Sequence, residues 1–546
     1  MKHREQSKRM EATMEKTAMI LAKHLKEEGI EYAFGIPGGE VLELLEAFRL
    51  VGIEFILTKH EMGAGFMADA YYQLTGKPGV LVSTLGPGIT NTVTPVANAY
   101  LDRSAMIVIT GEVSTKLKGV YTHQILEQRD LLKPVTKWST TLGGCSDSQS
   151  IQKAIDICKS GYPGPVHINI PTDVAVMQQK YIPRRKKTTS KVGPAAETID
   201  AFVNSLREAK KPVVLAGVGV ALEDAPAIQS FCRNWSVPLI TTYKAKGLLP
   251  ENDVLCFGGT GLSPVADGQH MQLVRDDADL VITIGFDPVE LRSDWNLSWQ
   301  TKTWNIDIVP NEYQLIPVDQ EYVGNIQSFF ESVNQITEVE SKWKQEDCLR
   351  YKEDLVKKIE PQEREGLSPF DVVSTCRELL PQDAIAIVDT GSHRIMLNHV
   401  WQCYEPKTLL QSNGLGSMGY ALPAGIAAQM VHRDRPVVIF TGDAGFDMII
   451  GELAMLPQHQ LPVTIVVFND QLLSLIRLKQ SRMNLETTGV EFSGINYQHL
   501  AKAYNGNGIT VETVEELQAA LKEVQSSPTF TIIDARVNPA EYWQQM

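Results

Sequence analysis

The stretch that decides the fold is "RPVVIFTGDAGF", residues 435–446, in which an apolar run gives way to a helix at a glycine-rich turn. Such a turn ordinarily binds phosphate, because its free backbone N–H groups and the positive end of the helix dipole face the ligand. Yet Asp443 stands in the turn itself, between Gly442 and Ala444. A carboxylate in a place suited to anions needs an explanation from the rest of the chain.

A second acid follows the next apolar run, "LPVTIVVFND", which ends in Asn469 and Asp470. The segment between the two acids, "DMIIGELAML", has helical periodicity. A right-handed strand–helix–strand unit brings both strand ends to one sheet edge, so Asp443 and Asp470 can converge. Two carboxylates would repel a phosphate unless a divalent cation lay between them, and Mg²⁺ suits such ligands. We therefore predict a Mg²⁺–diphosphate site; the alternative is that both acids only cap turns.

Short β-branched runs alternate with helical segments along the whole chain. Examples are "GVLVST", "AMIVIT", "PVHINIP", "PVVLAG", "LVITIG", "AIAIVDTG", "PVVIFTGD", "VTIVVFND" and "FTIIDA". Two polar stretches, residues 181–197 and 338–368, are predicted linkers, the second with an exposed charged helix. The segments that remain are 12–180, 198–335 and 366–546. We predict an α/β fold of three doubly wound parallel-sheet domains in series, with ligands at the carboxyl ends of the strands.

Length and composition agree with a globular protein of about three domains. The chain has 546 residues, of which 43% are hydrophobic and 21% charged. Its net charge of −14 makes it a poor candidate for binding nucleic acid.

The seven cysteines are scattered without a C-x-x-C pair, which argues against zinc and against disulfides. The N-terminal "MKHREQSKRMEATMEK" has no apolar region of a secretory signal, and no apolar run approaches the roughly 18 residues that span a bilayer. We expect a soluble, cytoplasmic protein that binds neither nucleic acid nor membrane.

Another carboxylate, Glu61, has a different setting. It precedes "MGAGFMADAYYQLTG", a helical segment rich in small residues, so its side chain can be partly buried. A partly buried glutamate can hold or pass a proton near neutral pH. The alternative is an ordinary acid at a helix N-terminus, favoured by the dipole. "LGPGITN", residues 85–91, forms a second glycine-rich turn suited to close approach of the backbone.

These motifs together resemble the thiamine diphosphate-dependent enzymes of the acetolactate synthase family, nearly from end to end. The first segment carries "FGIPGG", "KHEMGAGFMADAY", "TLGPGITN", "PVTKWS" and "GYPGPVHINIPTDV"; the third carries "NGLGSMGYALPAGIAA" and "GDAGFDMIIGELAML…VVFND". The motifs "DLVITIGFDPVE…WN" and "YTHQ" look closest to the catabolic, acetolactate-forming branch. The resemblance implies a pyrimidine-binding, a central and a diphosphate-binding domain.

The resemblance also implies roles for individual residues. Glu61 would hydrogen-bond N1′ of the cofactor's aminopyrimidine and drive its proton transfer. Gln124, in "YTHQ", would face the bound intermediate. Met418 would force the cofactor into a bent shape, and the carbonyl of Gly416 would accept a hydrogen bond from the pyrimidine amine. The resemblance implies Mg²⁺ ligation by Asp443, Asp470 and the main-chain oxygen of Leu472. It implies further cofactor contacts at Pro37, Gly86, Asn91, Gly442, Ala444, Gly445 and Leu473.

By this resemblance the protein is expected to decarboxylate a 2-oxo acid and ligate the product, condensing pyruvate to 2-acetolactate. The alternatives are a non-ligating 2-oxo acid decarboxylase, or a relative that acts on another anionic donor. A catalytically inactive cofactor-binding subunit is a third, which the presence of Glu61 and both metal-site acids disfavours. In this family Glu61 and the diphosphate site come from different subunits, so a homodimer or homotetramer is expected.

Two residues depart from the family pattern, and one glycine motif bears on whether the protein binds FAD. Asp470 stands where an asparagine is common, a conservative change of oxygen ligand. Lys479, in "LLSLIRLKQSR", stands where uncharged side chains are frequent; it could bind a substrate carboxylate or be a solvated helix lysine. "LAGVGVAL" has Gly217 and Gly219 but not the third glycine of a dinucleotide fingerprint. This pattern alone is weak evidence for any nucleotide. The family resemblance makes FAD possible in the central domain, but a flavin-free protein is favoured because "GFDPVE" resembles the catabolic branch, whose members lack FAD.

Overall fold

The computed structural model describes residues 13–184, 193–291, 299–311, 316–361, 365–525 and 527–542. Part of the N-terminal stretch (1–12), parts of the two predicted linkers (185–192 and 362–364) and the "WN" of the central motif lie outside these ranges.

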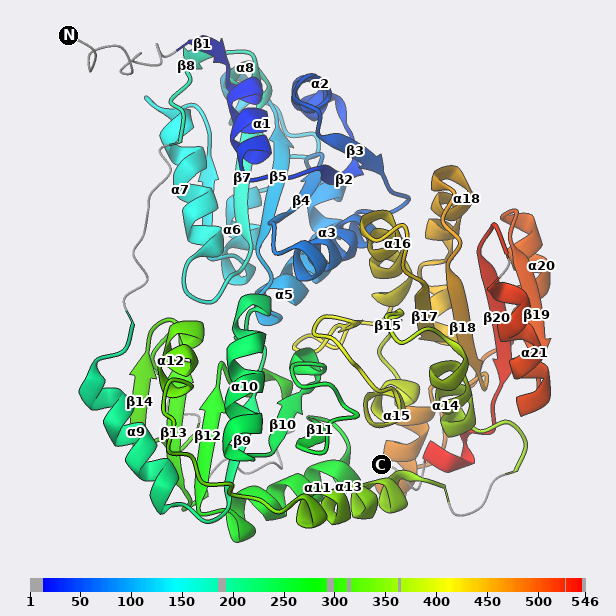
Figure 1. Cartoon of the computed structure of the whole chain (residues 1–546). Helices are drawn as coiled ribbons and strands as arrows, with labels where there is room; N and C mark the ends of the chain where they lie inside the picture. Colours follow the sequence, from blue (N-terminus) through cyan, green and yellow to red (C-terminus); the bar gives the residue numbers. More distant parts are fainter. Residues whose placement is uncertain are drawn as a thin grey trace. The chain divides into compact units, whose positions relative to one another are not determined.

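Three six-stranded parallel sheets form the frame of the chain (Figure 1). Each of the apolar runs quoted above contains a strand of one of them. The innermost strands are buried along their whole length, as is usual for parallel strands that carry helices on both faces. The predicted α/β class with three doubly wound sheets is confirmed.

The first sheet has the order β3-β2-β4-β5-β7-β6. Helices α1, α2 and α7 pack on one face around Val80 and Val82, and α3 packs on the other face, where Gly65 lies near Leu81. Its strands are β2 (Tyr32–Ile36), β3 (Glu54–Leu57), β4 (Gly79–Ser83), β5 (Met106–Glu112), β6 (Trp138–Thr141) and β7 (Val166–Pro171). Its helices are α1 (Thr17–Glu27), α2 (Leu42–Val51), α3 (Glu61–Thr75), α4 (Pro87–Asn91), α5 (Val93–Leu101), α6 (Gln128–Leu132), α7 (Asp147–Lys159) and α8 (Thr172–Ala175). A separate antiparallel pair joins β1 (Met14–Lys16) to β8 (Gln178–Lys180).

The central sheet has the order β11-β10-β9-β12-β13-β14, which is that of dinucleotide-binding domains. Its strands are β9 (Pro212–Ala216), β10 (Leu239–Thr242), β11 (Cys256–Thr260), β12 (Leu280–Ile284), β13 (Lys302–Asp307) and β14 (Gln320–Val323). The helices that accompany it are α9 (Ala196–Glu208), α10 (Ala225–Trp235), α11 (Pro264–Gln272) and α12 (Ile326–Val333). The charged helix predicted in the second linker is α13 (Gln345–Ile359).

The third sheet has the order β16-β15-β17-β18-β20-β19. Its strands are β15 (Ile385–Val388), β16 (Leu409–Gln411), β17 (Val437–Gly442), β18 (Thr464–Asn469), β19 (Asn507–Val511) and β20 (Thr531–Arg536). Its helices are α14 (Pro369–Leu379), α15 (Ser392–Val400), α16 (Ala421–Val431), α17 (Asp443–Asp447), α18 (Met455–His459), α19 (Ser474–Arg482), α20 (Tyr497–Ala503) and α21 (Val514–Val524).

The segment between the two acids differs from the single helix that its periodicity indicated. Helix α17 stops after five residues, and a 3₁₀ turn over Ile450–Ala454 separates it from α18. Gly451 and Pro457 explain the interruption, because glycine weakens a helix and proline cannot donate the next backbone hydrogen bond.

The chain divides into two compact units. The first sheet and its helices form one unit, whereas residues 101–103, the central sheet and the third sheet form the other. The domain boundaries 12–180, 198–335 and 366–546 remain predictions. In the part of the chain that the structure describes, no helix has the length and hydropathy needed to cross a bilayer.

Candidate functional site

A pocket opens in the third sheet where β15 lies between β16 and β17, the point at which the strand order reverses. Loops from the carboxyl ends of β15, β17 and β18 surround it, which is where open α/β sheets bind ligands. The pocket is lined by Thr390, Gly391, Ser392, His393, Met418, Gly442, Asp443, Ala444, Gly445, Phe468, Asp470, Leu472, Leu473, Ser474, Leu475, Ile476 and Tyr542.

Asp443 is the first residue of α17 and is buried at the edge of this pocket. One carboxylate oxygen accepts a hydrogen bond from the N–H of Ala444 at 2.8 Å, and the other accepts one from the N–H of Gln471 at 2.7 Å. Burial raises the pKa of Asp443 to about 7, and the nearby charge of Asp470 adds to the increase. The loop after β18 is thus attached to the acid that follows β17.

Asp470 follows β18 and lines the same pocket. Its carboxylate accepts hydrogen bonds from the N–H of Leu472 at 3.0 Å and from the hydroxyl of Ser474. Burial raises the pKa of Asp470 as well, although these hydrogen bonds favour the ionised form. Two acids with raised pKa values, near one another, form a site that a cation would stabilise.

The ligands present fit Mg²⁺ better than a metal held entirely by side chains. Among the described residues there is no group of three or more histidine, cysteine, aspartate or glutamate side chains that could hold a metal ion. A cation between Asp443 and Asp470 would therefore complete its shell with backbone oxygen, water and phosphate oxygens, as Mg²⁺ commonly does. Leu472 lies at the pocket, where the resemblance places a main-chain ligand.

A buried carboxylate that sequence reasoning missed, Asp389, holds the backbone that follows Met418. It accepts hydrogen bonds from the N–H of Gly419 at 3.0 Å and of Tyr420 at 3.3 Å. A Cβ at Gly445 would lie 2.9 Å from its Oδ2, so a side chain at this position would displace the carboxylate. Burial raises the pKa of Asp389 to about 6. Its position at the end of "AIAIVD" was the signal in the sequence that could have identified it.

His393 was also missed. It is buried on α15 and its ring stacks on Phe468, with ring centroids 5.1 Å apart and an interplanar angle of 17°. A Cβ at Gly442 would lie 3.2 Å from the same ring. Burial lowers the pKa of His393 to about 3, so the ring is neutral at pH 7 and packs against Phe468 and Gly442, the paired residues near the ends of β18 and β17.

The loop of Gly416 and Met418 reaches this pocket through Met418, whereas Gly416 is not among the lining residues. Gly416 has φ +64°, a conformation that favours glycine. The start of the loop is held by buried Asp102, which accepts hydrogen bonds from the N–H of Gly414 at 2.7 Å and of Asn413 at 3.2 Å. Asp102 also forms a buried ion pair with Lys244 at 2.8 Å.

In the first unit, Glu61 begins α3 and only 7% of its surface is exposed. The helix packs closely because its residues are small: a Cβ at Gly65 would lie 2.4 Å from the Pro95 ring. The amide of Asn91 donates a hydrogen bond to the Glu61 carboxylate at 3.0 Å. Glu61 is therefore held by an amide donor.

The glycine-rich turn after β4 brings Gly86 and Gln124 together. Gly86 has φ +61°, and a Cβ there would lie 2.8 Å from the Cβ of Gln124. Gly88 lies in the same turn, and a Cβ there would lie 3.5 Å from the Glu61 carboxylate. Pro37 is exposed in the loop after β2, whose Gly38 lies against the loop after β4. The residues predicted in the first segment thus gather at one edge of the first sheet.

Lys479 is placed differently from the other predicted residues. It is exposed on α19, one turn beyond Ile476, and is not among the residues that line the pocket. Leu473 lines the pocket directly.

Three family models match the chain in order. They are those of the N-terminal thiamine pyrophosphate (TPP)-binding domain of thiamine pyrophosphate enzymes over residues 15–132, the central domain over 199–333 and the C-terminal TPP-binding domain over 389–535. Each matched range contains strands of one of the three sheets.

Relatives of similar length include three proteins that are named as acetolactate synthases or their large subunits. Acetolactate synthase of Bacillus subtilis is 29% identical over 542 residues, which cover 95% of this chain and 93% of the relative. The acetolactate synthase large subunit of Lactococcus lactis is 28% identical, with 96% and 93% covered. A probable acetolactate synthase large subunit of Methanocaldococcus jannaschii is 30% identical, with 96% and 92% covered.

Proposed function

Because the chain belongs to the thiamine pyrophosphate enzymes, we propose that it is a thiamine diphosphate- and Mg²⁺-dependent carboligase of 2-oxo acids. In the proposed reaction one pyruvate loses CO₂, and the remaining two-carbon unit is joined to a second pyruvate to give 2-acetolactate. The similarity to proteins named acetolactate synthases along nearly the whole chain supports this substrate.

The observation that carries the proposal is the pair of acids at the switch point of the third sheet. Asp443 and Asp470, with the main-chain oxygen of Leu472, would hold Mg²⁺ against the diphosphate. Gly442, Ala444, Gly445 and Leu473 would contact that end of the cofactor. When bound, thiamine diphosphate supplies the electron sink for loss of CO₂, and the protein supplies orientation and proton transfer.

In this proposal the residues of the first unit contact the pyrimidine end of the cofactor and the substrate. Glu61 would bind N1′ of the pyrimidine and move a proton there, with Asn91 orienting its carboxylate through the 3.0 Å hydrogen bond. Pro37 and Gly86 would contact the ring, and Gln124 would face the substrate. From the third sheet, Met418 would support the bent cofactor, and the carbonyl of Gly416 would accept a hydrogen bond from the pyrimidine amine. Lys479 would bind the carboxylate of an incoming acid.

We further propose a homodimer or homotetramer in which Glu61 of one subunit serves the diphosphate site of another. The family resemblance supports this arrangement. The proposed domain boundaries are 12–180, 198–335 and 366–546. A cytoplasmic location is proposed because all seven cysteines, which lie within the described residues, are free thiols.

We propose that the protein works without FAD. The N–H of Gly217 donates to the carbonyl of Ile284 at 3.0 Å, and the N–H of Gly219 donates to Gly285 at 2.8 Å. A Cβ at Gly285 would lie 2.6 Å from the Gly219 carbonyl carbon. The N–H groups that a dinucleotide phosphate would require are therefore engaged between two loops at the switch point of the central sheet. An absorption spectrum of the purified protein tests this, because bound flavin would be visible.

Product identification tests the reaction. Purified protein is incubated with pyruvate, thiamine diphosphate and Mg²⁺, and the product is treated with acid, which converts 2-acetolactate to acetoin. We expect acetoin after acid treatment. Free aldehyde alone would reject the carboligase in favour of a simple decarboxylase. Cofactor binding without turnover of pyruvate would indicate another anionic donor or an inactive binding subunit, and assays with other 2-oxo acids would separate these two.

A further inference from the structure

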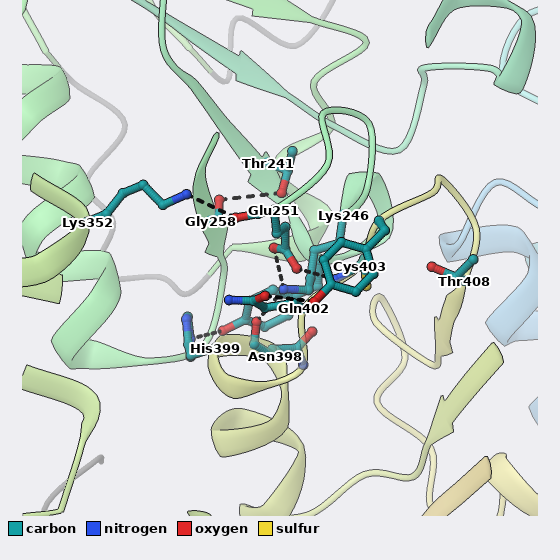
Figure 2. Close-up of polar contacts among 12 residues, drawn as sticks. Thr241, Lys246, Glu251, Gly258, Lys352, Asn398, His399, Gln402, Cys403 and Thr408 are labelled. Atoms are coloured by element: carbon teal, nitrogen blue, oxygen red, sulfur yellow. Dashed lines mark hydrogen bonds and ion pairs between the residues drawn. The ribbon is translucent and has the colours of Figure 1, made fainter. Parts of the chain in front are cut away.

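Helix α15 connects the pocket to the central sheet. At its N-terminal end, Gly391, Ser392 and His393 line the pocket. At its C-terminal end, Asn398 and His399 meet side chains from the segment that follows β10 (Figure 2). Any shift of the C-terminal end of this helix would therefore be transmitted to the pocket.

A buried ion pair fixes the C-terminal end of α15. Lys246 and Glu251 lie 2.6 Å apart, and their side chains are 2% and 8% exposed. The Lys246 ammonium also donates to the carbonyl of Asn398 at 2.7 Å. The last carbonyls of a helix have no partner within it, and a cation there is favoured by the helix dipole. Lys246 is thus a C-terminal cap supplied by another part of the chain.

The acidic partner holds the chain just beyond the helix. Glu251 accepts a hydrogen bond from the N–H of Cys403 at 2.6 Å, and its own N–H donates to the Cys403 carbonyl at 3.0 Å. Lys352 donates to the Glu251 carbonyl at 3.0 Å and so anchors this segment from α13. The two members of the ion pair therefore hold the backbone on both sides of the helix end.

Neighbouring contacts agree with a rigid junction. Asn398 and Gln411 exchange two amide hydrogen bonds of 2.9 and 2.8 Å, which attach α15 to β16. Tyr243 bonds the ring of His399 at 3.0 Å. Although burial opposes the charged form, Glu251 raises the pKa of Lys246, whereas burial lowers that of His399 well below its ordinary value. The lysine is therefore charged and the histidine neutral at pH 7.

We propose that Lys246 and Glu251 are positioning residues for the cofactor: they hold α15 so that Gly391–His393 are in place before thiamine diphosphate binds. A buried ion pair is weak evidence for stability as such, since the cost of removing two charges from water offsets much of their attraction. Its use here is to hold one arrangement of the helix end. This inference rests on the cofactor binding of the proposed function and not on the identity of the substrate.

The test is the double variant Lys246→Met/Glu251→Gln, which removes both charges together and leaves no buried charge unpaired. If α15 then spends only about a tenth of the time in the competent position, the apparent Kd rises about tenfold. We expect the Kd for thiamine diphosphate with Mg²⁺, measured by calorimetry, to rise at least about tenfold. We expect kcat at saturating cofactor to stay within about threefold, because neither residue touches the pocket.

The matched control is Arg103→Met/Asp287→Asn, which removes a 2.7 Å ion pair of the same unit between Arg103 and the loop after β12. We expect the Kd of this control variant for thiamine diphosphate with Mg²⁺ to stay within about twofold of the wild-type value. A folded Lys246→Met/Glu251→Gln protein with an unchanged Kd, or equal losses in both double variants, would overturn the proposal. Loss of turnover with normal cofactor affinity would overturn it too, and failure to make acetolactate would bear only on the substrate.

Hydrogen exchange of the wild-type protein tests the proposal even if the double variant does not fold. Hydrogen exchange of the cofactor-free protein should show strong protection of the amides in the last turn of α15, with little gain when thiamine diphosphate and Mg²⁺ are added. Fast exchange of these amides that becomes slow only with cofactor would show that the ion pair does not hold the helix in advance, and would reject the proposal.

Discussion

The first and third sheets have the same strand order and yet different chemistry at the corresponding edge. In both, the first strand along the chain lies between the second and third, and the last two strands exchange places. Both present a carboxylate at the start of a helix after a strand, Glu61 in one and Asp443 in the other. The difference lies in what each carboxylate faces.

Glu61 faces an amide, whereas Asp443 faces a second acid. The Asn91 amide donates to Glu61 at 3.0 Å, so this carboxylate has a partner without any cation. The pKa of Asp443 is raised to about 7 by burial and by Asp470. The two carboxylates thus differ in their nearest partner: the group proposed for proton transfer has an amide donor, and the group proposed to bind the metal ion has a second acid.

The largest expected effect on rate is that of the Glu61→Gln variant. General acid–base groups contribute about 10²–10⁴-fold to rate, so we expect kcat to fall by about 10³-fold. The Kd for thiamine diphosphate should stay within about tenfold, because the amide still hydrogen-bonds. Steady-state assays and calorimetry measure the two. Glu46→Gln, at an exposed position of α2, is the control that should keep its rate. A Glu61→Gln enzyme with unchanged kcat would contradict the proposed role of Glu61 in proton transfer.

The second test is Asp443→Asn, which leaves one acid in the third sheet. Loss of a charged interaction of about 1.5–3 kcal/mol predicts a fall in Mg²⁺ affinity of about 10- to 100-fold, with thiamine diphosphate affinity falling in parallel. Calorimetric titration with Mg²⁺ at fixed cofactor measures this.

The control for Asp443→Asn lies on the same helix. Asp447 accepts a hydrogen bond from the Tyr497 hydroxyl at 2.9 Å and is not a lining residue. Asp447→Asn should keep Mg²⁺ affinity within about threefold. Equal losses in both variants would mean that α17, and not the pair of acids, is what the cation requires.

The third test uses pH. Because the pKa of Asp443 is about 7, protons compete with Mg²⁺, and we expect affinity to fall about tenfold from pH 8 to pH 6. The folded-state pKa is raised, so this group stabilises the metal-free protein at low pH and that contribution is lost as pH rises through about 7. Mg²⁺ with cofactor should therefore raise Tm more at pH 8 than at pH 6. Asp443→Asn should show a smaller pH dependence; an identical one would assign the titration to another group.

The smallest expected effect is that of Lys479→Met. An exposed charge contributes about 1 kcal/mol or less to an interaction, so KM for pyruvate should rise less than about fivefold with kcat unchanged. Lys502→Met, at an exposed position of α20, is the comparison variant. A much larger rise in KM for Lys479→Met alone would show that α19 brings this lysine to the substrate when the cofactor is bound.

Local patterns were sufficient for the fold class and for the approximate places of the acids. Parallel strands buried on both faces favour continuous β-branched runs, and the length and composition of "VTIVVFND" and "GVLVST" indicate such strands. The helix between the acids was less predictable, because Gly451 and Pro457 interrupt a segment whose apolar periodicity is helical.

Local sequence patterns therefore predict the alternation of strands and helices and the polar residues that end the strands. Both depend on residues that are close together along the chain. Tertiary structure alone decided that Asp389 meets Gly445 and the Met418 loop, that Asn91 reaches Glu61, and that Lys246 caps α15. Partners such as Lys246 and Asn398 are far apart in sequence, and their contact exists only because packing brings the two segments together and excludes water, so that the buried charge must find its partners within the protein.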